Sequence, residues 1–209
     1  MTRGMRLTLL LAAALAGGRA PAAAQEPRLA SRLPEAVRAQ VDTLLDLARA
    51  AGLPTEPLVD RALEGASKRA DGARIVAAVR RLSGELATAR DALGLASLPA
   101  ELTAGASALR AGARPEDLRR LRVLRGQQPV TVAAAVLADL VAVGVPPDTA
   151  ASAVIALART TDDVAYLAFR RSIERDVALG ASPVAALGVR LAATEGDGSI
   201  AQYPGPRKP

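Results

Sequence analysis

The 209-residue chain has no histidine, cysteine or tryptophan, and its only aromatic side chains are two tyrosines and one phenylalanine. Without histidine, the chain can form neither a Ser-His-Asp triad nor a zinc site on imidazole groups. Without cysteine, it has no disulfides, iron–sulfur clusters or thiolate nucleophiles. We therefore expect a protein that is not an enzyme and that binds no cofactor and no metal. A carboxylate-based enzyme acting on envelope glycans is the alternative that the composition leaves open.

The first 24 residues have the pattern of a cleaved secretory signal. Arg3 and Arg6 precede a short apolar run from Leu7 to Ala16, and the small residues Ala22-Ala23-Ala24 follow. The run is much shorter than the roughly 20 residues that span a bilayer. The pattern predicts cleavage after Ala24 and export to the periplasm or the extracellular space.

Cleavage would change the charge of the protein. The full chain has 27 basic and 21 acidic residues, a formal net charge of +6. The predicted signal holds three of the basic residues and no acidic one, so the mature chain would have 24 against 21, a net charge of +3. Because this charge is small and export separates the protein from most nucleic acid, nucleic acid is a poor partner. We expect a protein partner, with anionic envelope polymers or lipid headgroups as the weaker alternative.

Beyond a polar lead at residues 25–32, apolar residues recur at helical spacing through residues 33–194. We expect an all-α domain of about eight or nine short helices there, and no strands. The segment from Val130 to Val143 is the most apolar, and it is predicted to be a central buried helix. Ser97 is the expected N-cap of another helix. A last helix is expected from Pro183 to Ala193, followed by a disordered, Gly/Pro-rich tail at residues 195–209.

Glycine followed closely by proline ends one helix and begins the next at four places. These signals are Gly52-Leu53-Pro54, Gly112-Ala113-Arg114-Pro115, Gly144-Val145-Pro146 and Gly180-Ala181-Ser182-Pro183. Their separations of 60, 32 and 36 residues fit a unit near 32 residues with one degenerate member. Stacked αα-hairpins need such a unit, because one hairpin cannot bury its apolar face alone. An irregular helical bundle with ordinary helix ends is the alternative.

Two groups of side chains are candidates for binding. The densest basic cluster consists of Arg114, Arg119, Arg120, Arg122 and Arg125. It could form an anion site for phosphate-bearing polymers or lipid headgroups. We favour a solvated helix face, because the acidic residues precede the arginines along the helix, as the helix dipole prefers.

The second candidate group is aromatic. Tyr166 and Phe169 lie one helical turn apart, and they either fill an alanine-rich core or anchor a partner. We favour the core, because apolar residues surround both in the sequence. The sequence as a whole predicts an exported, non-catalytic, α-helical interaction or scaffold protein. Peripheral attachment to a membrane through arginine-rich helices is a further alternative.

Overall fold

The computed structural model describes residues 27–200, with side chains described for residues 27–194. Residues 27–200 form ten α-helices and no strand, which confirms the all-α prediction with a slightly higher helix count. The helices are α1 (Pro27–Ala30), α2 (Glu35–Ala50), α3 (Glu56–Ser67), α4 (Gly72–Leu93), α5 (Pro99–Ala111), α6 (Pro115–Arg125), α7 (Thr131–Ala142), α8 (Pro147–Leu157), α9 (Asp163–Ala178) and α10 (Pro183–Ile200). The predicted signal segment, residues 1–24, lies outside the described residues.

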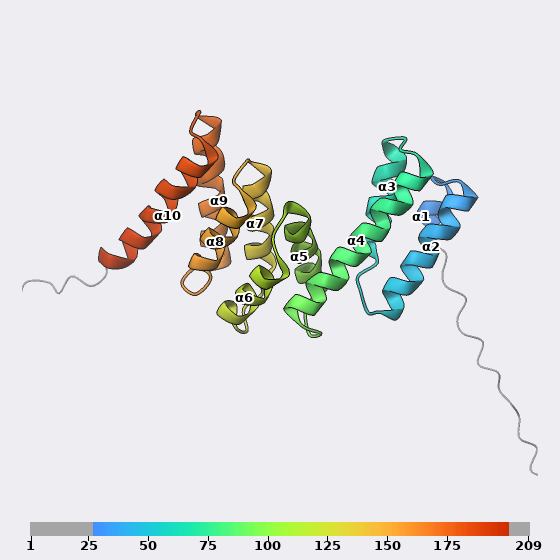
Figure 1. Ribbon diagram of the computed structural model, residues 1–209, viewed down its shortest axis with the longest axis horizontal. Helices are drawn as coiled ribbons and strands as arrows, with labels where there is room; N and C mark the ends of the chain where they lie inside the picture. Colours follow the sequence, from blue (N-terminus) through green and yellow to red (C-terminus); the bar gives the residue numbers. More distant parts are fainter. Residues whose placement is uncertain (1–26, 201–209) are drawn as a thin grey trace, which may run out of the picture.

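The helices stack as hairpins in an elongated row, from α1 and α2 at one end to α10 at the other (Figure 1). Two layers run along this row. Helix α7 packs between α5 and α9 in one layer, whereas α6 packs between α4 and α8 in the other, and α10 continues that second layer. The helix pairs α5–α6, α7–α8 and α9–α10 therefore follow one another along the row.

The hairpin turns share one hydrogen-bond pattern. After α5, the Gly112 amide donates to Leu109 O and the Ala113 amide donates to Ala108 O, each at 3.0 Å. This pair of bonds defines the Schellman motif, in which a residue with positive φ ends the helix. The same pair recurs at Gly52 and Leu53, Arg69 and Ala70, Gly144 and Val145, and Gly180 and Ala181. The repeated turns explain why glycine marks the hairpins in the sequence.

The turn between α3 and α4 lies at Arg69, 17 residues after Gly52 and 43 before Gly112. The unit near 32 residues is therefore not kept here, and the midpoint between the two glycines falls inside α4. Arg69 has a φ of 53° and is the one non-glycine residue with positive φ among the described residues. It takes the place that glycine has in the other hairpin turns, and Gly72 takes the place of the first helical proline. Because no glycine–proline pair marks the turn at Arg69, the sequence shows no hairpin signal between Gly52 and Gly112.

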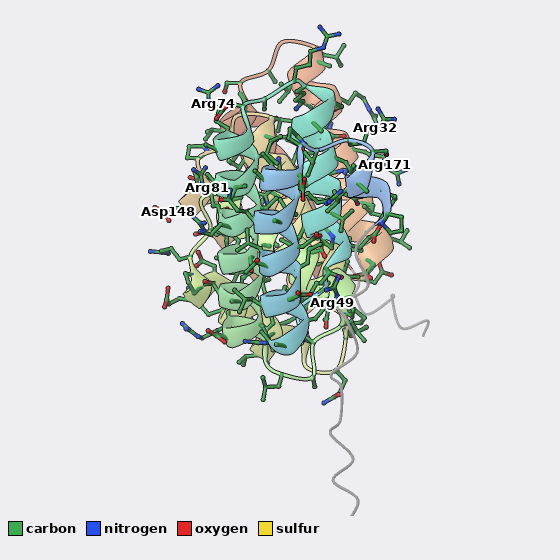
Figure 2. The ribbon with its side chains drawn as sticks, turned by 90° about the vertical axis from the view of Figure 1, so that its right-hand side faces the viewer. Arg32, Arg49, Arg74, Arg81, Asp148 and Arg171 are labelled. Atoms are coloured by element: carbon green, nitrogen blue, oxygen red, sulfur yellow. The ribbon has the colours of Figure 1, made fainter. Side chains whose placement is uncertain are left out.

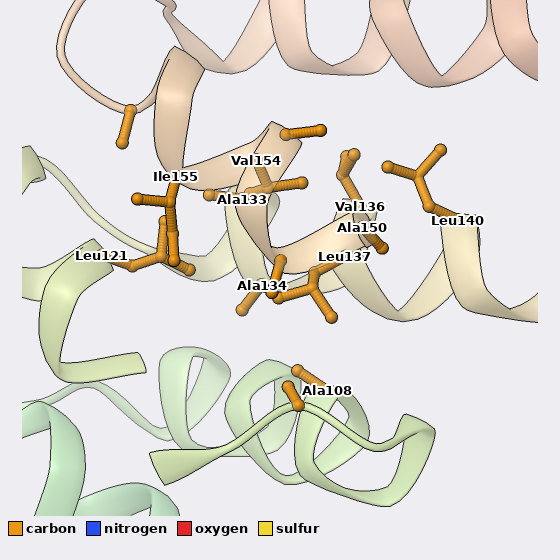
Figure 3. Packing of buried hydrophobic residues seen from close by; sticks show 14 of the residues in the cluster. Ala108, Leu121, Ala133, Ala134, Val136, Leu137, Leu140, Ala150, Val154 and Ile155 are labelled. Carbon is orange, nitrogen blue, oxygen red and sulfur yellow. The ribbon is translucent and has the colours of Figure 1, made fainter. Parts of the chain in front are cut away.

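The core extends along the stack in two adjoining clusters of buried apolar side chains. One cluster lies among α1 to α5 and the other extends from the end of α4 to α10. Figure 3 shows α7 in the middle of the second cluster, where Leu137 and Leu140 lie among alanine, valine and leucine side chains of neighbouring helices. Both leucines are fully buried, so the prediction that the segment from Val130 to Val143 forms a central helix is confirmed.

Helix α10 is longer than the sequence predicted. The preceding helices of its layer, α6 and α8, end at Arg125 and Leu157, each thirteen residues after the turn glycine of its hairpin. Ala193 has the corresponding position in α10, but this helix continues to Ile200. The expected tail boundary at Glu195 was wrong because no proline interrupts residues 184–200, and isolated glycines weaken a helix by only about 1 kcal/mol each. Residues 201–209 of the predicted tail lie outside the described residues.

Candidate functional site

The predicted arginine cluster does not form one open basic patch. Four of its five members pair with carboxylates: Arg114 with Asp117 and Asp148, Arg119 with Glu116, Arg122 with Glu101, and Arg125 with Asp163. Among the described residues, only Arg120 of the five forms no ion pair. The hydrogen bond from Arg114 to Asp117 raises the pKa of the Arg114 guanidinium. Since most of these charges are compensated within the fold, the cluster offers little free positive charge to an anion.

Arg125 is the most deeply buried member of the cluster, with 2% of its side chain exposed. It donates to Pro129 O at 2.8 Å, to Thr161 O at 3.0 Å and to the Asp163 carboxylate at 2.6 Å. Its guanidinium carbon also lies 5.5 Å from the centroid of the Tyr166 ring. The side chain therefore holds together the connector after α6, the connector after α8 and the start of α9.

Glu101 is a buried carboxylate that the sequence analysis missed. Its Oε1 accepts hydrogen bonds from the Val130 amide at 2.9 Å and from Arg122 at 2.5 Å, and its Oε2 accepts one from the Leu98 amide at 2.9 Å. Burial alone would raise the pKa of this carboxyl, but the amides of Val130 and Leu98 and the Arg122 guanidinium together lower it. Glu101 thus fixes the start of α5 to the start of the next hairpin.

The expected cap at Ser97 was wrong. The residue that precedes α5 is Leu98, and the carboxylate of Glu101, in the first turn, satisfies its amide. A glutamate three residues after the N-cap is a known capping pattern, so a sequence signal for this contact existed. The bonds from Glu101 to Val130 and Arg122 had no such signal, because they join segments far apart in the chain.

The two aromatic candidates lie in the core between α8 and α9. Tyr166 is fully buried, and its hydroxyl donates to Val154 O at 2.7 Å. Burial raises the pKa of this phenol to about 12. Phe169 is 5% exposed, and it forms part of the lining of an open groove. Between core filling and partner binding, Tyr166 is therefore a core residue, whereas Phe169 is a core residue that also lines a groove.

This groove, which we call the C-terminal groove, lies between α8, α9 and α10 and encloses about 870 Å³. Most of its lining side chains are small. The full set of lining residues is Ala156, Leu157, Thr160, Thr161, Ala165, Ala168, Phe169, Ser172, Arg190, Ala193 and Thr194. A groove with so many alanines, serines and threonines lets another chain approach its backbone closely.

The repeat explains why the groove is open. Phe169 lies eleven residues before its turn glycine, where the α5–α6 hairpin has Glu101, and Arg190 lies ten residues after it, where that hairpin has Arg122. In the α5–α6 hairpin, the connector to α7 crosses these positions and its Val130 amide binds Glu101. In the last hairpin, α10 continues past Ala193 instead of turning into a connector. The space that a connector occupies in the earlier hairpin is therefore left open here.

The charges around the C-terminal groove are uneven. Within it, Arg190 forms two hydrogen bonds of 2.7 Å to Asp176, which lower the pKa of this carboxyl and raise that of the guanidinium. Arg159 and Arg171 directly adjoin lining residues in the sequence, and Arg175 follows Ser172 by one turn. All three are exposed, and none of them forms an ion pair with a described carboxylate. Three exposed arginines close in sequence to the lining residues are thus free of ion pairs with described carboxylates.

The acidic residues of α9 and its N-cap have structural partners. Asp162 accepts from the Ala165 amide as the N-cap of α9, Asp163 pairs with Arg125, Glu174 with Arg170, and Asp176 with Arg190. No group of three or more acidic residues among the side chains of residues 27–194 is arranged to hold a metal ion. No helix in that part of the chain is long and apolar enough to cross a membrane.

Comparison of the chain with protein-family models, with curated proteins and with solved structures found no match.

Proposed function

We propose that this protein is an exported, non-catalytic helical-repeat module that binds a partner protein in the C-terminal groove. The observation that carries this proposal is the open space at the end of the stack. The connector of the α5–α6 hairpin occupies part of the equivalent space and leaves about 380 Å³ beside Glu101 and Arg122, whereas the last hairpin leaves about 870 Å³ between α8, α9 and α10.

The distribution of apolar side chains supports the same end of the molecule as the binding surface. Nine large hydrophobic residues are exposed in the described part of the chain, and five of them belong to the last hairpin. These five are Val164, Leu167, Leu179, Val184 and Val189. At the other end of the stack, the short helix α1 covers α2 and α3, and its Leu29 is fully buried. An exposed apolar surface at one end of a repeat stack is typical of an interaction site.

The ionisable residues support a non-catalytic role. Glu101, Asp117 and Arg125 are the buried charged residues among those described, and each is held by hydrogen bonds within the fold. A catalytic carboxylate needs a free face toward a substrate. These three groups instead join successive hairpins or cap a helix.

Filling the groove tests the proposal. Ala168 is exposed on the wall of the groove, so Ala168→Trp should fill it without disturbing the core. Ala77, exposed on α4, provides the matched control Ala77→Trp. After cross-linking in an envelope extract, the wild type and Ala77→Trp should retain the same stoichiometric partner, and Ala168→Trp should lose it. Retention of that partner by Ala168→Trp, or the absence of any partner, contradicts the proposal.

Export has a separate test. If the first 24 residues are a cleaved signal, mass spectrometry of the protein from the native host should find Gln25 at its N-terminus. A mature protein that retains Met1 contradicts export by this route.

A further inference from the structure

The connectors between hairpins show what kind of chain the stack holds in this space. After α6, the Val130 amide binds Glu101, while Pro129 O accepts from Arg125 and Gln128 O accepts from Arg122. Each contact uses a backbone group of the connector, and a side chain of the hairpin supplies the partner. The α5–α6 hairpin therefore binds a non-helical segment through its backbone.

Of the three side chains that bind this connector, the last hairpin keeps one at the equivalent position, and Ala193 stands where the earlier hairpin has Arg125. Arg190 has the position of Arg122, and Phe169 offers an apolar floor where Glu101 lies in the earlier hairpin. The alanines on both walls leave room for a backbone, and Thr160 and Thr161 bring hydroxyl groups to one edge. A bound peptide could therefore take the course of the connector, with its backbone near Arg190 and a small apolar side chain on Phe169.

From these features, and resting on the function proposed above, we propose that the C-terminal groove binds an extended, acidic segment of the partner protein in the place of the absent connector. The acidic character follows from Arg159, Arg171 and Arg175, which are exposed, lie next to or one turn from lining residues in the sequence, and form no ion pair with a described carboxylate. Carboxylates of a bound segment would form charge-assisted hydrogen bonds with these guanidinium groups.

The same charges argue against two other occupants. A second copy of the chain that docked through this surface would bring Arg171 and Arg175 against their own counterparts, with like-charge repulsion. Residues 201–209 of the chain itself contain Arg207 and Lys208 and no acidic residue, so they cannot neutralise the three arginines. A flat anionic membrane would meet the arginines but would leave the floor of a concave groove unfilled.

A selection of short random peptides displayed on phage, with the full chain as bait, tests the proposal. The selected peptides should be rich in aspartate and glutamate, should lack helical spacing of apolar residues, and should fail to bind Ala168→Trp. Each selected peptide is then synthesised with a fluorescent label, and its affinity is measured by anisotropy. Binding should weaken as salt rises, because exposed ion pairs are screened.

Charge reversal tests whether Arg171 and Arg175, rather than positive charge anywhere on the protein, bind the peptide. Arg171→Glu with Arg175→Glu should weaken peptide binding about tenfold or more, since each exposed pair contributes a modest amount and reversal makes it repulsive. The matched control is Arg74→Glu with Arg81→Glu on α4. Seen along the stack, Arg74 and Arg81 lie on the side of the molecule opposite Arg171 (Figure 2). The control should change the affinity less than twofold.

Several results would overturn the proposal. They are a selection that yields basic or amphipathic helical peptides, a selection that yields no peptide sensitive to Ala168→Trp, and equal effects of the two charge reversals. Binding to phosphatidylglycerol vesicles that the Arg171 and Arg175 reversal abolishes, without any acidic peptide selected, would assign these arginines to a lipid surface instead. If Ala168→Trp loses its cross-linked partner but charge reversal has no effect, the proposed function is supported and the proposal of an acidic bound segment is contradicted.

Discussion

Gly112 packs against Pro147, so that a Cβ atom added at Gly112 would lie 2.9 Å from Pro147 Cγ. Gly112 is in the turn of the α5–α6 hairpin, and Pro147 is the first residue of α8 in the next hairpin. The contact recurs one unit later, where a Cβ at Gly144 would lie 3.2 Å from Pro183 Cγ. At these two turns, glycine and proline therefore act across hairpins as well as within them, since the proline of the next hairpin packs against the turn glycine.

Alanine substitution at the three turn glycines should destabilise the protein in a graded order. All three have similar φ values, 109° at Gly112, 104° at Gly144 and 101° at Gly180, so backbone strain of about 1–3 kcal/mol is common to them. The Gly112→Ala variant should lose about 1–3 kcal/mol more than Gly180→Ala, because its methyl group would collide with a rigid ring. Gly144→Ala should fall between them. Urea unfolding followed by circular dichroism gives the three free energies.

The Gly180→Ala variant is the internal control of this series. Nothing lies within 4 Å of a Cβ at Gly180, because no described hairpin follows it. Equal losses in the three variants would show that the contact between hairpins contributes nothing beyond backbone strain.

Replacing Arg69 by glycine should stabilise the protein. Arg69 holds a φ of 53°, a conformation that costs a non-glycine residue about 1–2 kcal/mol, and its exposed side chain forms no ion pair with a described residue. Glycine removes this strain but loses more backbone entropy on folding, by about 0.5–1 kcal/mol, so we expect a net gain below about 1 kcal/mol. Thermal melting should show a higher Tm. A lower Tm would mean that the Arg69 side chain contributes to the fold.

The turns show how far the sequence could predict this fold. Helical spacing of apolar residues predicted the all-α class, and the high apolar content of residues 130–143 predicted the burial of α7, because both are properties of the local sequence. The turn at Arg69 escaped prediction because arginine gives no signal for positive φ, although the backbone bonds there match those at Gly112. The open groove could not be predicted, because it depends on where α10 ends in relation to α8 and α9. The pairing of Arg122 with Glu101 likewise depends on contacts between distant segments.

Replacing Glu101 by glutamine should destabilise the protein at neutral pH by about 2–3 kcal/mol, the usual range for hydrogen bonds to a buried charged group. The carboxylate accepts from two backbone amides and from Arg122, whereas a glutamine side chain has one oxygen acceptor and places an amino group near these donors. The free energy of unfolding of the two proteins at pH 7 tests this expectation.

The difference between wild type and Glu101→Gln should shrink in acid. The native hydrogen bonds lower the pKa of Glu101 below the value of about 4.3 that an unfolded glutamate has. The wild type therefore keeps the full stabilisation above about pH 4.3 and loses it as the pH falls through the lower native pKa. Glutamine does not titrate, so the Glu101→Gln variant lacks this carboxylate stabilisation at every pH. A gap in Tm that stays constant down to pH 3 would contradict a lowered native pKa.

Arg125→Met should lower the free energy of unfolding by about 1–3 kcal/mol, the range for buried acceptors left without a donor, because the partly exposed Asp163 carboxylate remains hydrated. Methionine keeps much of the side-chain volume in the core, but it leaves Pro129 O, Thr161 O and Asp163 without their donor. The matched control is Arg120→Met, on the same helix, where the side chain is exposed and forms no ion pair with a described residue, and its effect should stay within about 0.5 kcal/mol. Urea unfolding of both variants measures the difference. If Arg125→Met were as stable as Arg120→Met, the buried arginine would not be what joins the two connectors.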